Sequence, residues 1–256
     1  MPLLSYGRLV PSKDDGGSRY VERRRMRKHE KSKRGIVKRR GAQTAKGAHK
    51  DFSPLATELA ELGRGFYGRG WVLGTSGNFS AVLSHQPLRL AITSTGLDKG
   101  NLAPTHFLEM DDAANVVRGD GRPSAEALLH VAIVRELKAG AVLHTHSVWS
   151  TVLSGACAAK GGVALEGYEM LKGLEGVRTH QHREWLPILE NSQNIAELAQ
   201  RVKEVLRENA RIHGFLLRQH GLYTWGSSLQ EAKRHVEILE FLMEVLVRSG
   251  AGSRTI

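Results

Sequence analysis

The chain has very little cysteine: Cys157 is the only one in 256 residues. A single thiol can form neither a disulfide within the chain nor a thiolate metal cluster, so both are excluded. Runs of about 18 apolar residues are also missing, which excludes a membrane-spanning helix. Residues 1–10 lack the apolar core of a secretory signal. We therefore expect a protein of the reducing cytoplasm that does not enter a membrane.

Excess positive charge is confined to one end of the chain. Of the 37 basic and 26 acidic residues, 16 and 4 lie in residues 1–50, which leaves 21 basic and 22 acidic residues in a nearly neutral body. A segment with so few apolar residues cannot offset the entropy that it would lose on ordering. We predict a disordered basic extension over 1–50, a folded domain over 51–250 and a flexible tail over 251–256.

The basic extension has two interpretations. Lysine and arginine clusters at 23–28 and 38–40 are of the kind that binds phosphates non-specifically, so the extension could contact nucleic acid or another acidic surface. An inert extension is the simpler interpretation. We expect no sequence-specific nucleic-acid partner.

Apolar periodicity in the body alternates between helices and strands. Ser53 and Pro54 are typical of a helix start, and four glycines between 63 and 70 predict its end. Asn194 and Ser228 each begin a capping box at the start of a later helix. The other predicted elements are strands at 88–93, 107–110, 116–117, 141–143, 215–217 and 222–226, and helices at 123–137 and 149–158. This interleaving predicts an α/β fold with a mixed sheet between helical layers.

Two histidines end a short buried strand. His144 and His146 follow the apolar residues 141–143, and residues i and i+2 of a strand point to the same side. His220 also follows an apolar strand. If the two strands are neighbours, the three imidazoles form a catalytic metal site with open positions. Zinc is the default ion for such a site, because it binds imidazole well and is not redox-active.

Two alternatives to this metal site remain open at the level of the sequence. His144 and His146 could be one core and one solvated histidine without a metal. His180 and His182 form a second His-x-His pair. We rank the second pair lower because no apolar strand leads into it.

Two small-residue turns precede the histidine strand. Residues 74–80 (GTSGNFS) and 93–96 (TSTG) are rich in glycine and hydroxyl groups. Such turns can offer backbone N–H groups to a phosphate, although either turn alone is weak evidence. A metal that polarises a carbonyl oxygen, beside a phosphate site, favours proton abstraction next to the ketone of a sugar phosphate.

Five ordered motifs over about 52–250 resemble the class II aldolase and adducin-type family. They are Gly-Thr-Ser-Gly-Asn at 74–78, Ser-Thr-Gly at 94–96, Pro-Ser-Ala-Glu at 123–126, His-Thr-His at 144–146 and Gln-His-Gly at 219–221. The resemblance implies a three-layer α-β-α catalytic domain with a nine-stranded mixed sheet, and a homotetramer with its sites near subunit interfaces. It also implies one zinc ion per subunit on His144, His146 and His220. The residues that match phosphate contacts of the family are Thr75, Gly77, Asn78, Thr95, Gly96 and Ser124.

Two further segments, 167–173 (GYEMLKG) and 187–193 (PILENSQ), resemble the dehydratase branch of this family. This implies removal of water from 5-methylthioribulose 1-phosphate in methionine salvage, through an enediolate formed by loss of the C3 proton. Glu169 matches the acid/base of that branch, and Glu126 matches the acid/base of the aldolases. We expect Glu169 to be the acid/base, Glu126 to lie near the metal or the phosphate, and Lys172 to neutralise the phosphate.

Plainer roles stay open for these three residues. Glu126 could be an ordinary acid at a helix start, Glu169 a surface carboxylate and Lys172 an exposed lysine. Two other functions also remain. Retro-aldol cleavage of another ketose phosphate would use the same metal and enediolate, whereas a non-catalytic adducin-like interaction module would lack the metal ligands.

Overall fold

The computed structural model describes residues 50–209 and 211–250. The predictions made for 1–49 and 251–256 lie outside these residues. The Lys50 N–H donates to the carbonyl of Leu83 (2.9 Å), so the described chain contacts the sheet from its first residue. No helix in the described ranges is long and apolar enough to cross a membrane.

Nine strands form one sheet in the order β4-β3-β2-β1-β5-β9-β8-β7-β6. Only β7 and β8 pair in parallel, and the other neighbours are antiparallel, so the sheet is mixed. The strands are β1 (Asn78–His85), β2 (Leu88–Thr93), β3 (Phe107–Met110), β4 (Val116–Arg118), β5 (Ala141–Thr145), β6 (Gly162–Glu166), β7 (Arg183–Leu189), β8 (Gly214–Leu217) and β9 (Gly221–Gly226).

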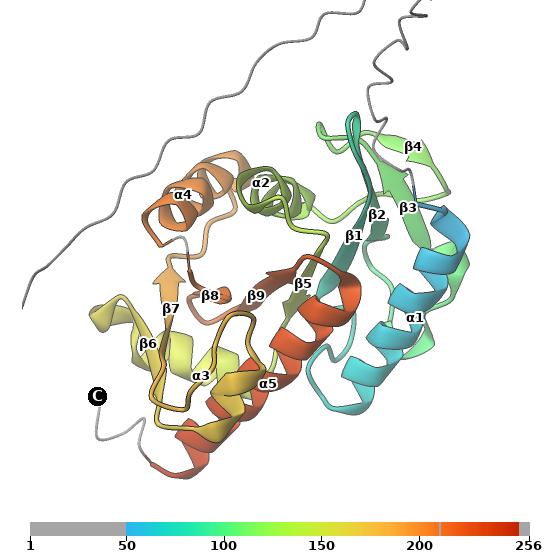
Figure 1. The fold of residues 1–256 in the computed structure, drawn as a ribbon. Helices are drawn as coiled ribbons and strands as arrows, with labels where there is room; N and C mark the ends of the chain where they lie inside the picture. The colour runs from blue at the N-terminus through green and yellow to red at the C-terminus, as the bar shows by residue number, and fades with distance from the viewer. Residues whose placement is uncertain (1–49, 210, 251–256) are drawn as a thin grey trace, which may run out of the picture. The chain divides into compact units, whose positions relative to one another are not determined.

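Helices cover both faces of the sheet (Figure 1). They are α1 (Phe52–Gly68), α2 (Ala127–Leu137), α3 (Val148–Ala156), α4 (Ile195–Glu208) and α5 (Leu229–Arg248). Side chains alternate along β5: Val142 packs in one core with α2 and α4, while Leu143 packs in another with α1 and α5. A third core joins α3 and the C-terminal half of α5 to β6 and β7. The predicted three-layer α-β-α fold is therefore confirmed.

The first helix begins before the predicted start, and it ends at Gly68, within the glycine-rich stretch that predicted its end. Its N-cap is Asp51, whose side chain accepts a hydrogen bond from the Ser53 N–H, so the helix begins before the Ser-Pro pair. It continues through Gly63, because this glycine faces the sheet: a Cβ there would lie 2.5 Å from Leu102 and 2.9 Å from Phe79. Close packing of the helix on the sheet, rather than helix termination, explains that glycine.

The later N-caps are confirmed, but not as complete capping boxes. Asn194 and Ser228 accept hydrogen bonds from the N–H groups three residues on. The N–H of Asn194 donates to Oγ of Ser192, and Glu231 accepts from the N–H of Ser227 rather than that of Ser228.

Four other segments are corrected. The helix predicted over 123–137 begins at Ala127. The predicted helix 149–158 begins earlier, at Val148, and ends at Ala156. Residues 161–176, left untyped by the sequence, form β6 and a 3-10 helix, η4 (Glu169–Gly173), and β7 was not predicted. The other 3-10 helices are η1 (Lys99–Asn101), η2 (Pro104–His106) and η3 (Ala158–Lys160).

Candidate metal centre

The three predicted histidines meet at one end of the central strands of the sheet. His144 is the fourth residue of β5, and His146 follows its end; His220 lies in the tight turn between β8 and β9. Their strands are not direct neighbours, the condition considered in the sequence analysis, since β9 lies between β5 and β8. Both β5 and β8 run antiparallel to β9. The C-terminal ends of β5 and β8 therefore lie at the same end of the sheet. The β8–β9 turn places His220 beside the end of β5, although β9 lies between the two strands.

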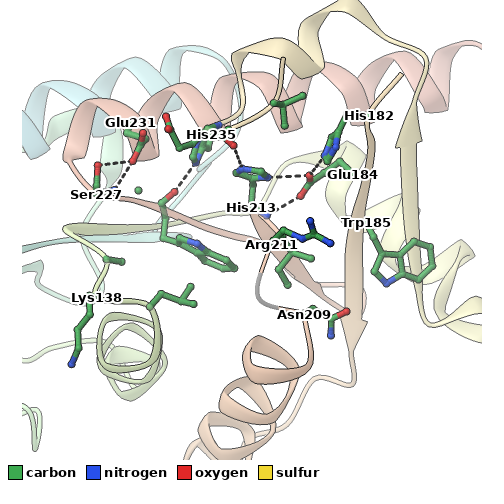
Figure 2. Close-up of a pocket in the computed structure, with 18 of the residues that line it drawn as sticks. Lys138, His182, Glu184, Trp185, Asn209, Arg211, His213, Ser227, Glu231 and His235 are labelled. Atoms are coloured by element: carbon green, nitrogen blue, oxygen red, sulfur yellow. Dashed lines mark hydrogen bonds and ion pairs between the residues drawn. The ribbon is translucent and has the colours of Figure 1, made fainter. Parts of the chain in front are cut away.

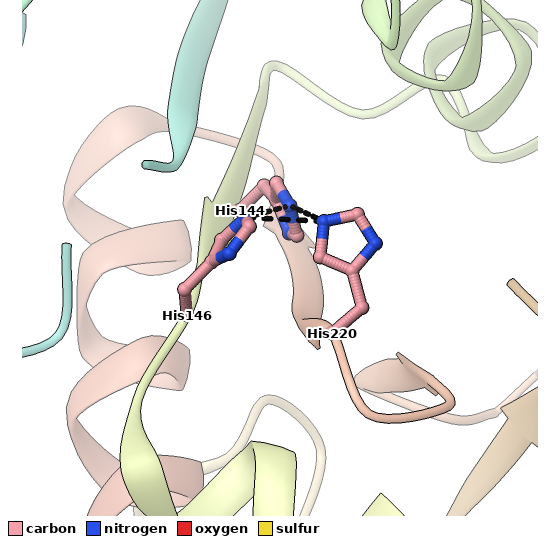
Figure 3. A group of neighbouring side chains, drawn as sticks. All are labelled: His144, His146 and His220. Atoms are coloured by element: carbon pink, nitrogen blue, oxygen red, sulfur yellow. Dashed lines mark hydrogen bonds between the residues drawn. The ribbon is translucent and has the colours of Figure 1, made fainter. Parts of the chain in front are cut away.

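The imidazoles converge through their Nε2 atoms (Figure 3). The Nε2–Nε2 distances are 2.8 Å for His144–His146, 3.3 Å for His144–His220 and 3.2 Å for His146–His220. Nitrogen atoms about 2.0–2.1 Å from one tetrahedral zinc ion lie about 3.3 Å apart. Within the described ranges, these histidines are the one group of three or more potential ligands close enough to share an ion. The donor set therefore fits a metal with a vacant coordination position.

Partners on the far side of two rings direct Nε2 toward the shared centre. The Nδ1–H of His144 donates to the carbonyl of Leu222 (3.0 Å), and Nδ1 of His220 lies 3.3 Å from Oδ1 of Asn191. A ring proton on Nδ1 leaves the Nε2 lone pair free for a metal. Two such lone pairs in one small volume repel each other unless a cation lies between them.

Burial keeps the strand histidines neutral. It lowers the pKa of His144 well below its usual value, and the neighbouring imidazoles of His146 and His220 add to the effect. Burial, followed by the charges of His220 and Lys99, lowers the pKa of His146 to about 4. Both imidazoles are therefore unprotonated at neutral pH, as a metal ligand must be.

Gly221 allows the close approach that brings His220 to the site. A Cβ at this position would lie 2.0 Å from the Thr145 carbonyl oxygen and 3.1 Å from Cε1 of His144. The preceding Gln219 has a left-handed backbone (φ 51°). The glycine of the Gln-His-Gly motif is thus required by the spacing between β9 and β5, not by a turn conformation of its own.

A polar row crosses the sheet below the histidines. Strand register sets Asn78 opposite His144 and His144 opposite Tyr223. The Tyr223 ring stacks on His144 with 3.9 Å between ring centroids. Burial, and then the charge of Glu126, raises the pKa of Tyr223 well above its usual value. The phenol therefore stays neutral and acts as a flat support for the ligand ring.

Glu126 projects into the histidine cluster from the N-cap of α2. Its Oε1 lies 3.2 Å from Nε2 of His220, and its Oε2 lies 3.6 Å from Nε2 of His144. Its side chain makes no capping hydrogen bond to the helix. Instead Oε2 accepts a hydrogen bond from Nδ2 of Asn78 (2.7 Å). The helix-start explanation of Glu126 is therefore insufficient, because the carboxylate is aimed at the candidate metal position.

A cavity of about 170 Å³, the metal-site cavity, adjoins the histidines. It brings together six of the seven residues predicted to bind the phosphate, all except Lys172, and three of the predicted metal or acid/base residues. Its lining consists of Thr75, Ser76, Gly77, Asn78, Thr93, Ser94, Thr95, Gly96, Lys99, Ser124, Glu126, His146 and His220. The two small-residue turns therefore lie beside the metal centre, as the phosphate interpretation requires.

Lys99 is a lining residue that sequence reasoning missed. It is only 1% exposed, and burial lowers its pKa to about 8, against an opposing effect of Asp98. In the sequence it is one lysine in a polar segment, which usually means a solvated side chain. Its position three residues after the second turn was the available signal.

Glu169 and Lys172 do not line this cavity. Both lie on η4, where the Glu169 carboxylate, 70% exposed, pairs with the Lys172 ammonium and lies 3.8 Å from Nδ1 of His180. The hydrogen bond and charge of Lys172 lower the pKa of Glu169, so it is ionised at neutral pH.

His182, of the rival His-x-His pair, belongs to a different cavity of about 920 Å³, drawn in Figure 2. Ala139, His213 and Gly226 line it, so it lies at the opposite end of β5, β8 and β9. Here the buried Glu184 accepts hydrogen bonds from His182 Nε2 (2.8 Å) and from the backbone N–H and Nδ1 of His213 (2.8 and 3.0 Å). Burial alone raises the pKa of Glu184, but these donors bring it below its usual value. His180 and His182 thus bind separate carboxylates rather than a shared ion.

Comparison with known proteins agrees with this geometry. Residues 57–247 match the model of the class II aldolase and adducin N-terminal domain. Methylthioribulose-1-phosphate dehydratase of Methylococcus capsulatus is 46% identical over 200 residues, which cover 77% of this chain and 95% of that protein. The protein of the same name in Pseudomonas savastanoi pv. phaseolicola is 44% identical over 191 residues, covering 74% and 92%.

Solved structures give the same fold. The YgbL protein of Escherichia coli is 28% identical with a TM-score of 0.62, and the match covers 77% of this chain and 89% of that one. An L-fuculose 1-phosphate aldolase has a TM-score of 0.65 at 23% identity, covering 80% and 90%, and this likeness bears on the fold alone.

Proposed function

Because the chain belongs to the class II aldolase and adducin family, we propose that it is a lyase of methionine salvage. It removes water from 5-methylthioribulose 1-phosphate to give 2,3-diketo-5-methylthiopentyl 1-phosphate, the activity for which its dehydratase relatives are named. The observation that carries this proposal is the convergence of three Nε2 atoms beside the cavity lined by both small-residue turns. This arrangement suits a ketose phosphate, because the histidines would hold a metal that polarises the carbonyl and the turns would bind the phosphate.

Zinc, one ion per subunit, is the proposed cofactor, held by His144, His146 and His220. The three-nitrogen donor set and the neutral state of the buried imidazoles support this choice. When bound, zinc supplies a Lewis acid that makes negative charge on the C2 oxygen and the neighbouring hydroxyl less costly. Glu126, 3.2 Å from Nε2 of His220, adds a negative charge that favours a dication at this position.

The chain's own residues position the substrate and move its protons. The turns that contain Thr75, Gly77, Thr95 and Gly96 bind the phosphate, with Asn78 and Ser124 beside them. A carboxylate takes the C3 proton, and the electron pair of that C–H bond becomes part of an enediolate. The C4 hydroxyl then leaves as water with a proton returned by the acid, and the resulting enol tautomerises to the diketone. Each proton taken is returned, so the reaction is a net loss of one water molecule.

Glu169 is the proposed acid/base. The likeness of 167–173 to the dehydratase branch supports this assignment. The metal-site cavity, at about 170 Å³, is smaller than the roughly 300–1,000 Å³ of usual ligand pockets. Part of the binding site must therefore come from a further segment, and we assign this part to η4, from the same or a neighbouring subunit. Glu126 remains the carboxylate nearest the metal.

A homotetramer is the proposed assembly. Large apolar side chains are exposed on several elements: Leu73 (57%) precedes the first turn, Val148 (61%) and Val152 (47%) lie one helical turn apart on α3, and Phe241 (46%) lies on α5. Exposed apolar groups of this size commonly mark contacts between chains. Light scattering after gel filtration measures the mass, and a monomer would exclude the assembly.

Product analysis tests the proposed reaction against its main alternative. The zinc-loaded protein is incubated with 5-methylthioribulose 1-phosphate and, separately, with L-fuculose 1-phosphate, and the products are followed by proton NMR. We expect the diketone phosphate from the first and no aldehyde from the second. Release of an aldehyde without diketone would make the protein an aldolase. Absence of turnover with both would favour an adducin-like interaction module.

A further inference from the structure

Lys99 joins the two turns that line the metal-site cavity. Its Nζ donates to the carbonyl of Thr75 (3.0 Å), in the first turn, and to the carbonyl of Leu97 (2.7 Å), directly after the second. Residues 74–77 and 94–96 lie at the same end of the paired strands β1 and β2, before β1 and after β2. The Phe79 N–H donates to Oγ1 of Thr93 (3.1 Å) where the two strands meet these turns. The ammonium group of Lys99 adds a direct link between the turns themselves.

The surroundings of Lys99 do not fully satisfy its charge. An ammonium group has three N–H donors, and in the described ranges two carbonyls accept from it. Neutral carbonyl groups compensate only part of the free energy that a buried charge loses on leaving water. That cost appears in the lowered pKa of about 8. A neutral donor would serve equally well if the only task were to join two carbonyls.

An arriving phosphate would complete this compensation. Lys99 is the one lysine or arginine among the described residues that line the cavity, which also contains the carboxylate of Glu126. A phosphate close to that carboxylate needs a nearby cation, and opposite charges attract more strongly in a partly buried site. Lys172, expected from the sequence to serve this purpose, is exposed and paired with Glu169.

We propose that Lys99 is the cationic residue of the phosphate subsite and sets the preference for a phosphorylated over an unphosphorylated ketose. This inference rests on the proposed function in its choice of substrate. Lys99 is a binding and positioning residue: it contacts the phosphate end of the substrate and holds the two turns that enclose it.

Paired kinetics with Lys99→Met test the proposal. Methionine keeps the length and apolar volume of the chain but removes the charge. We expect kcat/KM for 5-methylthioribulose 1-phosphate to fall about 10- to 100-fold, mainly through KM, while kcat/KM for unphosphorylated 5-methylthioribulose stays within about threefold. Lys99→Arg, which keeps the charge, should retain most of the preference. Lys233→Met, an exposed change on α5, is the matched control. An equal fall for both substrates in Lys99→Met would mean a purely structural role and overturn the proposal.

Thermal unfolding with inorganic phosphate gives a readout that needs no turnover. Phosphate at about 50 mM should raise the unfolding temperature of the wild type and of Lys233→Met, but not that of Lys99→Met. An equal rise in Lys99→Met, or no rise in the wild type, would overturn the proposal. If the wild type fails to dehydrate 5-methylthioribulose 1-phosphate, yet phosphate raises its unfolding temperature in a Lys99-dependent way, the proposed function is wrong while the anion site stands.

Discussion

Asn78 and His130 are in hydrogen-bond contact beneath the candidate metal centre, with His130 Nε2–H directed at Oδ1 of the Asn78 amide. The His130 ring is fully buried and its other nitrogen lies 2.8 Å from Oγ of Ser80. Burial lowers the pKa of His130 to about 3, so the ring is neutral and carries one proton. Because Oδ1 of Asn78 is occupied, its Nδ2 group points at Glu126 (2.7 Å). His130 thus determines which end of the amide faces the carboxylate.

His130→Leu is expected to lower turnover without removing the metal. Leucine cannot donate to Asn78, whose amide can then rotate and turn its oxygen toward Glu126. Two buried polar groups also lose their partner, at about 1–3 kcal/mol each in the free energy of unfolding. We expect kcat to fall about tenfold or more with zinc content unchanged. His130→Gln, which can donate again, should recover part of kcat; no recovery would argue against control of the amide orientation.

Glu126→Gln and Glu169→Gln separate the roles of the two carboxylates. Loss of an acid/base commonly costs about 10²- to 10⁴-fold in rate, so Glu169→Gln should lose at least 100-fold in kcat and keep its zinc. Glu126→Gln should weaken zinc binding about tenfold, because a charge beside two ligands is lost. The control is Glu166→Gln, a change of an exposed carboxylate on β6 that pairs with Arg183. Full turnover in Glu169→Gln would refute its role.

Gly221→Ala tests the close approach of β9 and β5. The new Cβ would lie 2.0 Å from the Thr145 carbonyl oxygen, so the strands must separate and carry His220 away from its partners. We expect zinc affinity to fall at least tenfold and the unfolding temperature to fall by several degrees. Gly65→Ala is the matched control, since its Cβ meets nothing within 4 Å in the interior of α1. If the two variants bind zinc equally well, the strand spacing does not govern the site.

Acid should destabilise the fold through its buried imidazoles. Burial lowers the pKa of His235 to about 4. Below about pH 6.5 this imidazole therefore binds a proton in the unfolded chain, whereas in the folded chain it stays unprotonated until about pH 4. The free energy of unfolding should therefore fall by about 1.4 kcal/mol per pH unit for this group between about pH 6 and 4. The free energy of unfolding, measured by urea at several pH values, should depend less steeply on pH in His235→Gln, by that amount. An unchanged pH dependence would contradict the assignment of this effect to His235.

Local patterns predicted much of the site, and long-range packing decided the rest. The period of two along β5 was enough to bring His144 and His146 to one side, and small-residue composition was enough to find both turns. His220 needed the order of β5, β9 and β8, which pairs strands that are far apart in sequence. The partners of Asn78 and Lys99 depend on buried contacts between separate elements, so no local pattern distinguishes this lysine from a solvated one.

The same limit explains the error at the start of α1. Ser53 and Pro54 carry the usual signs of a helix start, yet Asp51 caps the helix because its side chain reaches the Ser53 N–H. The glycine-rich stretch did predict the end of the helix, at Gly68, but the tight contact of Gly63 with Leu102 and Phe79 exists only in the folded chain.

Catalysis should depend on one zinc ion held by the three histidines. Metal-free protein is titrated with zinc, and the ions bound per chain and the rate of diketone formation from 5-methylthioribulose 1-phosphate are measured on the same samples. We expect no turnover without metal and a linear rise that ends at one ion per chain. We also expect that His220→Ala neither binds that ion tightly nor forms product. Full diketone formation by metal-free protein, or by His220→Ala, would show that the histidine-bound ion is not required.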